Sequence, residues 1–229
     1  MDTDYDIVHL DEVASTQDEA STAFRRSGVS TLVIADRQLE GRGRSGRSWL
    51  PPDEAMFASF ATMPAWESQD HPIIPLLAAL AIRRSLEVHT GVVVDVKWPN
   101  DLLVEGAKVG GILVEGSADA VTIGCGINLV WADPPAFAGA VLAGSGGTGF
   151  SIDIARTWVD ALRTMLREGA AGWPIDAYRA ACVTIGERVR WDGGEGIAAD
   201  VGADGALVVV DSAGQHRVIS GDVHLLGGS

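Results

Sequence analysis

The fold is decided by residues 92–129, VVVDVKWPNDLLVEGAKVGGILVEGSADAVTIGCGINL, in which apolar runs alternate with short turns. The runs VVVDVKW, VGGILVE and VTIGCGINL are rich in β-branched residues and end at Gly, Pro, Asn or Asp, which is typical of β-strands. Upstream, TLVIAD at 31–36 and MFASFATM at 56–63 have the same character. We therefore expect these five runs to form one mixed or antiparallel sheet.

Three helices are expected around this sheet. PIIPLLAALAIRRSLEVHTG at 72–91 has the Leu and Ala content of a largely buried helix, and Gly91 suits its C-terminal end. SIDIARTWVDALRTMLREG at 151–169 predicts an amphipathic helix capped by Ser151 or Asp153. PIDAYRAAC at 174–182 predicts a shorter third helix. A mixed sheet flanked by helices places the chain in the α+β class.

The chain changes character near Val183. ERVRW, GIAADV, ALVVVD and HRVISGDVHLL read as short strands separated by Gly-Gly, Asp-Gly and Ala-Gly turns. This pattern predicts a small β-barrel attached to the larger body. We therefore expect two domains, residues 1–182 and residues 183–229.

Charge and length restrict the kinds of function. The 229 residues carry a net charge of −14, so long-range repulsion argues against broad binding to DNA or to an anionic membrane. The apolar stretch 72–81 is too short to span a bilayer, and the acidic start lacks the features of a signal peptide. We therefore expect a cytoplasmic protein. Cys125 and Cys182 have no companion at metal-ligand spacing and are expected to be buried thiols.

Positive charge is concentrated in a few places. The chain has two lysines, Lys97 and Lys108, and three of its arginines fall within GRGRSGR at 41–47. Alternating glycines let the backbone approach a ligand closely, and arginines donate paired hydrogen bonds to phosphate oxygens. The run is not a Walker A loop or a dinucleotide-binding GxGxxG motif. A solvated flexible loop is the alternative, but the position between a strand and Trp49 favours a site for an anion.

Three further motifs could line a site. KWPND at 97–101 predicts a tight turn followed by Lys108 and two glycines, and an ordinary hairpin would explain the turn residues equally well. GCGINL at 124–129 places glycines inside a strand, where either tight strand packing or the approach of a ligand explains them. Thr16 and Glu19 fit a capping box, so Thr16 is expected to cap a helix while its hydroxyl can still face a pocket.

Taken together and in this order, ASTQDEA, ADRQLEGRGRSGRSW, KWPNDLL, KVGGILVE and IGCGINL resemble the successive signatures of the biotin protein ligase family. The resemblance covers essentially the whole chain, including GDVHLL near its end. It implies a catalytic domain with the fold of class II aminoacyl-tRNA synthetases and biotin ligases, and a small SH3-like C-terminal barrel. The DNA-binding domain of repressor-type members has no counterpart here, which implies a ligase without the repressor function.

The resemblance also implies roles for individual residues, with biotin and ATP as substrates and Mg²⁺ as the accompanying ion. The residues implied in biotin binding are Ser15, Thr16, Gln17, Gln38, Gly41, Arg42, Gly43, Arg44, Lys108 and Gly111. Those implied in ATP binding are Arg42, Arg44, Arg47, Trp49, Lys97, Asn100, Lys108 and Asn128. Lys108, Arg44 and Asp101 are implied in catalysis, with Asp101 orienting the incoming amine or serving only the turn. No residues are assigned as metal ligands.

The implied reaction joins biotin to AMP and then transfers it to a lysine of a biotin carboxyl carrier protein or a carboxylase biotin domain. We expect no DNA or membrane partner, and a monomer or weak homodimer. A lipoate ligase or related acyltransferase and a non-catalytic binding protein with a regulatory role are the alternatives. Three departures from the family pattern are Gln17 in place of Asn, Leu39-Glu40 before the Gly/Arg run, and Cys125 at a small or apolar position. Glu40 could pair with a loop arginine.

Overall fold

A seven-stranded sheet forms the centre of the computed structural model, which describes residues 4–47, 49–50, 52–117, 120–144 and 149–226. Its strands are β1 (Asp6–Val13), β2 (Thr31–Gln38), β3 (Glu54–Thr62), β4 (Asp95–Lys97), β5 (Asp101–Val104), β6 (Ala107–Gly116) and β7 (Val121–Val130). They pair in the order β1-β2-β3-β7-β6-β5-β4. The β1–β2 pair is parallel and the other pairs are antiparallel, which confirms the predicted mixed sheet.

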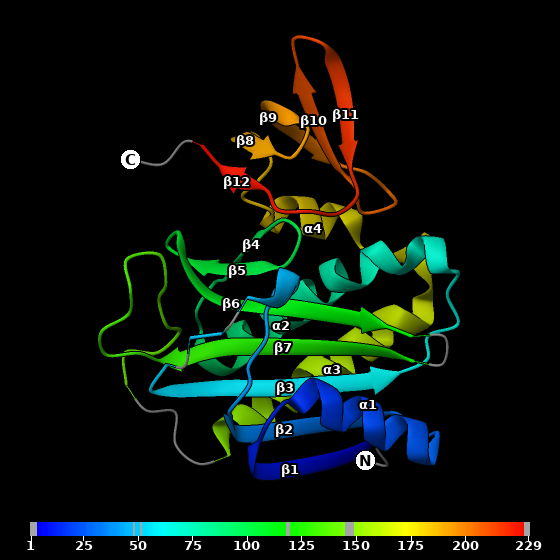
Figure 1. Cartoon of the computed structure of the whole chain (residues 1–229), viewed down its shortest axis with the longest axis vertical. Helices are drawn as coiled ribbons and strands as arrows, with labels where there is room; N and C mark the ends of the chain where they lie inside the picture. The colour runs from blue at the N-terminus through cyan, green and yellow to red at the C-terminus, as the bar shows by residue number, and fades with distance from the viewer. Residues whose placement is uncertain (1–3, 48, 51, 118–119, 145–148, 227–229) are drawn as a thin grey trace.

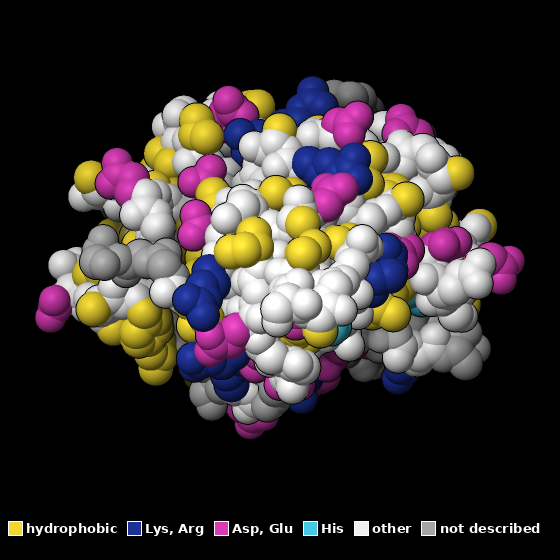
Figure 2. All heavy atoms as spheres, turned by 90° about the horizontal axis from the view of Figure 1, so that it is seen from above, with side chains coloured by type: hydrophobic (Ala, Val, Ile, Leu, Met, Phe, Trp, Pro, Cys, Tyr) yellow, Lys and Arg dark blue, Asp and Glu magenta, His cyan; other side chains and the backbone are white. Residues whose placement is uncertain are grey.

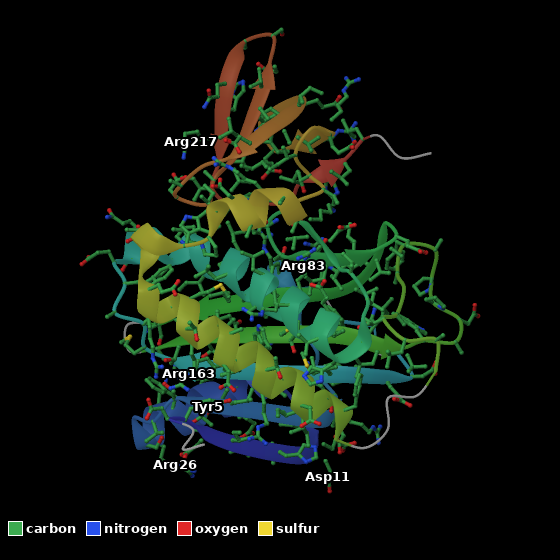
Figure 3. The ribbon with its side chains drawn as sticks, turned by 180° about the vertical axis from the view of Figure 1, so that it is seen from behind. Tyr5, Asp11, Arg26, Arg83, Arg163 and Arg217 are labelled. Atoms are coloured by element: carbon green, nitrogen blue, oxygen red, sulfur yellow. The ribbon has the colours of Figure 1, made fainter. Side chains whose placement is uncertain are left out.

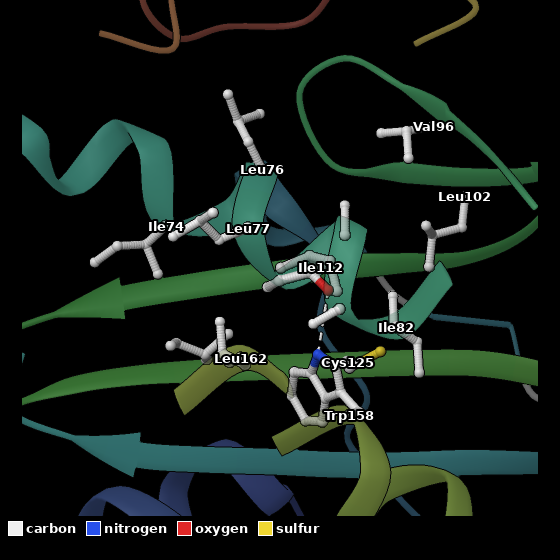
Figure 4. Packing of buried hydrophobic residues seen from close by; sticks show 14 of the residues in the cluster. Ile74, Leu76, Leu77, Ile82, Val96, Leu102, Ile112, Cys125, Trp158 and Leu162 are labelled. Carbon is white, nitrogen blue, oxygen red and sulfur yellow. Dashed lines mark hydrogen bonds between the residues drawn. The ribbon is translucent and has the colours of Figure 1, made fainter. Parts of the chain in front are cut away.

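Helices cover both faces of this sheet. Helices α2 (Ile74–Thr90) and α3 (Phe150–Glu168) pack against each other on one face, and α1 (Thr16–Ser27) packs on β2, β3 and β7 from the other (Figure 1). Trp158 of α3 is fully buried between these layers, and its Nε1 donates a hydrogen bond to the carbonyl of Ala78 at 3.1 Å (Figure 4). Because this apolar layer fills one face, a ligand site is restricted to the face that carries α1.

The helix ends follow local backbone chemistry. Gly91 ends α2 in the left-handed region at φ 72°, and its N–H donates to the Glu87 carbonyl, as the sequence predicts. The start predicted for α3 was wrong, because its cap is Gly149 at φ 88°. Ser151 and Asp153 lie inside the first turn, where a carboxylate complements the helix dipole. The third predicted helix is confirmed as α4 (Ile175–Ala181).

A second, antiparallel sheet follows α4. Its strands are β8 (Arg188–Trp191), β9 (Gly194–Val201), β10 (Leu207–Asp211), β11 (Gly214–Val218) and β12 (His224–Leu225), in the order β11-β10-β9-β8-β12. The predicted C-terminal β structure is confirmed, while closure of a barrel stays a prediction, as does the domain boundary after Cys182. Trp98, directly after β4 of the first sheet, contacts the second sheet, because its Nε1 donates a hydrogen bond to the carbonyl of Gly205, between β9 and β10, at 3.0 Å.

The surface at the end of the molecule that carries the second sheet mixes charges of both signs. Figure 2 shows acidic and basic side chains interspersed among apolar ones on this face. Within the part of the chain that the structure describes, no helix has the length and apolar character needed to cross a membrane.

The amino-terminal strand is fastened to α3 by Tyr5. Its hydroxyl donates to Oδ1 of Asp160 at 3.0 Å, and the guanidinium of Arg163 lies 4.7 Å from the centre of its ring (Figure 3). Burial of the ring and the charge of Asp160 raise the pKa of Tyr5 to about 12. The neutral phenol is therefore the form that the fold stabilises.

Candidate active site

A cavity of about 610 Å³ opens on the face of the sheet that carries α1. It is bounded by the start of α1, the Gly/Arg loop, the β4–β5 turn, strands β6 and β7, and the segment between β11 and β12. The predicted site residues on its lining are Ser15, Thr16, Gln17, Gln38, Arg42, Gly43, Arg44, Arg47, Trp49, Lys97, Asn100, Asp101, Lys108, Gly111 and Asn128. Motifs that are far apart in the sequence therefore meet in one place, and their roles stay predictions.

Gly41 is the one predicted site residue that does not line this cavity. A Cβ atom at this position would lie 3.0 Å from Cβ of Trp49 and 3.1 Å from Nε2 of Gln38. The Gly41 carbonyl accepts a hydrogen bond from the backbone N–H of Trp49 at 2.9 Å. Gly41 therefore gives the loop room to return close to its own start.

The first residues of α1 form a polar cluster at one end of the cavity. Gln38 Oε1 accepts hydrogen bonds from the backbone N–H of Thr16 at 2.9 Å and from its hydroxyl at 3.0 Å. Since that hydroxyl proton is committed to Gln38, the Ser59 hydroxyl 2.8 Å away must donate to Thr16. The three side-chain groups and the backbone N–H of Thr16 are thereby oriented, which suits recognition of a small polar ring.

The predicted capping box was wrong. The cap of α1 is Ser15, Thr16 is the first helical residue, and no side chain caps the helix. The Thr16 hydroxyl is instead occupied by Gln38 and Ser59, as the expectation that it could face a pocket allowed. A local sequence pattern was overridden by hydrogen bonds to β2 and β3, which no local pattern encodes.

The Gly/Arg loop is a defined structure with its arginines paired to the rest of the chain. A short 3₁₀ turn spans Arg44–Gly46, and the N–H of Gly43 donates to the carbonyl of Arg47 at 2.7 Å. Arg44 donates to Asn100 Oδ1 at 3.1 Å and to the carbonyl of Gly221 at 3.0 Å. Arg47 Nη2 lies 2.8 Å from Oδ1 of Asp222. The loop thus joins the β4–β5 turn to the segment before β12.

Arg42 pairs with the other side of the cavity mouth. Its Nη2 lies 2.7 Å from Oδ1 of Asp18 and 3.5 Å from the Ser15 hydroxyl. The hydrogen bond and charge of Asp18 raise the pKa of Arg42. Glu40, which could have paired with a loop arginine, also raises this pKa, but through its charge alone and less than Asp18 does. The ion-pair partner given by the structure is therefore Asp18.

Lys108 and Asp101 face each other across β5 and β6. The Lys108 ammonium is hydrogen-bonded to Oδ1 of Asp101, and Lys97 Nζ lies 3.7 Å from Oδ2 of the same carboxylate. These side chains are between a fifth and two-fifths exposed, so the cluster borders the cavity and can be reached from it. The predicted tight turn after Lys97 is confirmed, and the antiparallel pairs β4–β5 and β5–β6 bring both lysines of the chain to one carboxylate. An anionic ligand that binds Lys108 must displace or share Asp101.

The glycines of β6 and β7 serve two purposes. A Cβ at Gly126 would lie 3.3 Å from the indole of Trp49, and one at Gly111 would lie 3.6 Å from it. These two paired glycines therefore make room on the cavity side. Gly110 instead reflects tight packing, because a Cβ there would lie 2.6 Å from Cδ1 of Ile127. The expectation that both glycines of the β6 pair leave room for a ligand is therefore wrong at Gly110, and whether a ligand approaches Gly111 or Gly126 stays a prediction.

The two asparagines predicted for the nucleotide side are both fixed by backbone contacts. Asn100 Nδ2 donates to the Ile112 carbonyl at 2.7 Å, so its Oδ1 is left to accept from Arg44. Asn128 Nδ2 donates to the Gly139 carbonyl at 2.9 Å. Its Oδ1 is buried and has no partner among the residues described. Both side chains thus present an oxygen whose orientation is set by the chain itself.

Several lining residues were not among the predicted site residues, namely Ser59, Trp131, Phe137, Asp222, Val223 and His224. Ser59 is a single polar residue within the apolar run of β3, which is the one local signal that could have found it. Asp222 was missed because its partner, Arg47, is 175 residues away in the sequence.

The cysteines are free and buried, as predicted. Burial raises the pKa of the Cys125 and Cys182 thiols, which disfavours the thiolate form required of a metal ligand or nucleophile. Over the described ranges, no group of three or more His, Cys, Asp or Glu side chains is arranged to hold a metal ion.

The fold is an α+β scaffold in which cationic side chains border a cavity of about 610 Å³. The sequence model of the biotin/lipoate A/B protein ligase family matches residues 12–128, and the chain belongs to this family. The biotin–[acetyl-CoA-carboxylase] ligase of Paracoccus denitrificans is 30% identical over 242 residues, covering 93% of this chain and 98% of that protein.

Two other similarities differ in coverage. The bifunctional ligase/repressor BirA of Bacillus spizizenii is 38% identical over 130 residues, and the match spans 54% of this chain but 40% of that protein. The biotin protein ligase of Aquifex aeolicus in complex with biotin and ATP superposes with a TM-score of 0.77 at 26% identity. That alignment covers 96% of this chain and 98% of the Aquifex chain. The fold is therefore shared from the first sheet through the second.

Proposed function

We propose that the protein is a biotin protein ligase, which forms biotinyl-AMP from biotin and ATP and transfers biotin to a lysine of a carrier protein. The observation that carries this proposal is the arrangement of one cavity, with a polar cluster at one end and cationic groups along its side. Thr16 and Gln38 belong to the first, and Lys108 and Arg44 to the second. The similarity to the Paracoccus ligase and to the Aquifex ligase in complex with biotin and ATP supports biotin and ATP as the substrates.

The first step joins two anions. A carboxylate oxygen of biotin attacks the α-phosphorus of ATP, the bond to the β-phosphate oxygen breaks, and pyrophosphate leaves. Lys108 and the loop residues Arg42 and Arg44 would offset the negative charge of the two reactants and of the transition state. In the structure Lys108, Arg42 and Arg44 contact Asp101, Asp18 and Asn100, respectively. The substrates would take over these contacts.

The second step uses the activated carbonyl. The neutral amine of a carrier lysine attacks the carbonyl carbon of the mixed anhydride and forms the amide bond. The bond between that carbon and the bridging oxygen breaks, AMP leaves with the electron pair, and the amine loses a proton to solvent. We propose that Asp101 orients this amine, because its carboxylate lies at the cavity edge between two strands. The Gly/Arg loop would exclude water from the anhydride while it waits for the carrier.

Mg²⁺ would accompany the phosphates of ATP. The resolved side chains offer no group of three or more acidic, His or Cys ligands, so the ion would be held chiefly by the nucleotide. We further propose a cytoplasmic monomer or weak homodimer, with residues 1–182 as the catalytic domain. Carriers would be the biotin carboxyl carrier protein or carboxylase biotin domains.

A lipoate ligase is the second candidate, because the matching family includes lipoate enzymes. The test is pyrophosphate release from Mg-ATP by the purified chain with biotin, with lipoate and with neither acid. Release that requires biotin is expected. Release with lipoate alone would assign the protein to the lipoate enzymes, and no release with either acid would contradict a ligase activity.

A further inference from the structure

Two cavities meet at a single side chain, that of Gln17. The second cavity has a volume of about 270 Å³ and lies between α1 and the ends of β6 and β7. Among the described residues, Gln17 is the one residue that lines both this cavity and the larger one. The side chain is buried, with 6% of its surface exposed. It therefore stands as a partition at the polar end of the proposed ligand site.

The orientation of the Gln17 carboxamide is fixed by chemistry. Its Nε2 lies 2.9 Å from Oε2 of Glu115 and 3.4 Å from the carbonyl of Thr122. Both neighbours can only accept hydrogen bonds, so the NH₂ group must face them and the carbonyl oxygen must face away. Oε1 then lies on the side of Gly124, where a Cβ would approach it to 2.7 Å. Gly124 and Ser59 line the larger cavity beside it.

The oxygen that faces this side is unpaired. Gln17 Oε1 is buried and has no hydrogen-bond partner among the residues that the structure describes. A buried acceptor without a hydrogen bond is unfavourable, because it has lost the hydrogen bonds that water would supply. The site therefore favours a ligand that brings an N–H group to this end of the cavity.

We infer that Gln17 is a specificity-determining residue and Glu115 its positioning residue, together selecting acids whose ring head carries an N–H donor and limiting the size of that head. This inference rests on the proposed function and deepens it. The ureido ring of biotin supplies such a donor, whereas the dithiolane ring of lipoate has none. A site built to pair with an N–H group rejects a ligand that lacks it more strongly than an apolar pocket rejects a small change in size.

Size selection follows from the partition. Gln17 separates about 610 Å³ from a further 270 Å³, so its truncation would extend the head end of the site. A biotin methylated on a ureido nitrogen has lost a donor and gained bulk. The native protein would reject it, and a variant with a small residue at 17 would accept it better.

The test is pyrophosphate release with biotin, lipoate and N-methylbiotin by the full chain and four variants. Gln17→Leu should lower kcat/KM for biotin by roughly 10- to 100-fold and leave lipoate unchanged. Gln17→Ala should raise kcat/KM for N-methylbiotin relative to kcat/KM for biotin. Glu115→Ala should change these ratios of kcat/KM in the same direction by a smaller factor, and the change should appear in KM and not in kcat. Glu115→Gln should restore them, because its amide oxygen can accept from Gln17.

Glu19→Ala is the matched control, since it removes an exposed carboxylate from α1 outside both cavities. A merely structural role for Gln17 would lower activity with all acids together and leave the ratios constant, which would overturn the inference. Absence of biotin-dependent release from the native chain would overturn the proposed ligase activity alone. In that case the affinity of the native and Gln17→Leu proteins for biotin would be measured by calorimetry. Equal affinities, or no binding by either protein, would overturn the inference as well.

Discussion

The ammonium of Lys108 is hydrogen-bonded to the carboxylate of Asp101 across strands β5 and β6, at the edge of the main cavity. Lys97 approaches the other oxygen of the same carboxylate at 3.7 Å. A pair in this half-exposed position can exchange partners, because neither charge is locked into a dry interior. Under the proposed mechanism, an incoming carboxylate would replace Asp101 as the partner of Lys108, and Asp101 would then be free to orient the amine.

Lys108→Ala should slow formation of the adenylate by roughly 10²- to 10³-fold. Removal of a single donor to developing negative charge costs roughly 10²- to 10³-fold in rate. Single-turnover release of pyrophosphate with saturating biotin and ATP measures this step. Arg217→Ala, which removes a cation from the second sheet where it pairs with Asp204, should leave the rate unchanged. A native rate in Lys108→Ala would contradict the role.

Asp101→Asn should separate the two steps. The substituted side chain keeps its shape but loses the charge that would orient the carrier amine. We expect transfer of biotin to the carrier to slow roughly 10-fold or more, while adenylate formation changes less, in line with the loss of one positioning group. The two rates are compared by adding carrier to preformed adenylate. An equal loss of rate in adenylate formation and in transfer would show that Asp101 only positions Lys108 and does not orient the amine.

Arg44→Ala should release the adenylate prematurely. Arg44 joins the loop to Asn100 and to the carbonyl of Gly221, so its loss removes both connections at once. Free biotinyl-AMP in the medium, measured after a single turnover, is expected to rise severalfold relative to the native protein. An unchanged amount of free adenylate would show that other contacts close the loop.

The sequence predicted the main strands but missed β1 and β5. β1 reads DIVHLDEV, in which polar residues interrupt the apolar pattern, because an edge strand needs little burial. β5 has four residues and lies directly after the KWPND turn, so it is too short to show a period of its own. The inner strands β3 and β7 are buried on both faces and are unmistakable from their composition alone.

The site was predicted where local motifs are dense and missed where a contact is long-range. Glycines, arginines and lysines near each other in the sequence indicated the lining from the loop and β6, while the family resemblance supplied Ser15, Thr16 and Gln17 at the start of α1. The contacts of Arg44 and Arg47 with Gly221 and Asp222 depend on how the second sheet packs on the first. The pairing of Gln17 with Glu115 likewise spans 98 residues. No spacing rule connects such distant positions, so only the three-dimensional structure reveals them.

Tyr5→Phe should flatten the alkaline stability profile. The pKa of Tyr5 is raised to about 12 in the folded protein, whereas an unfolded tyrosine titrates near about 10. The folded state therefore binds the proton more tightly, and the contribution is fully present below pH 10 and is lost as pH rises through 12. Urea unfolding at pH 9 to 12 should show a steeper loss for the native protein. Parallel profiles would contradict the assignment, since Cys125 and Cys182 are common to both proteins.

Gly110→Ala should destabilise the fold without a direct effect on the site. A Cβ at Gly110 would lie 2.7 Å from the backbone carbonyl oxygen of Gly126 and 2.6 Å from Ile127. Backbone cannot move aside as a side chain can, so the cost should be about 1–3 kcal/mol. For a chain of this length each kcal/mol lowers Tm by about 2–4 °C. Gly116→Ala, in the same strand with no atom within 4 Å, is the matched control and should leave Tm nearly unchanged. Equal melting temperatures of the two variants would show that β6 and β7 can separate enough to admit a methyl group.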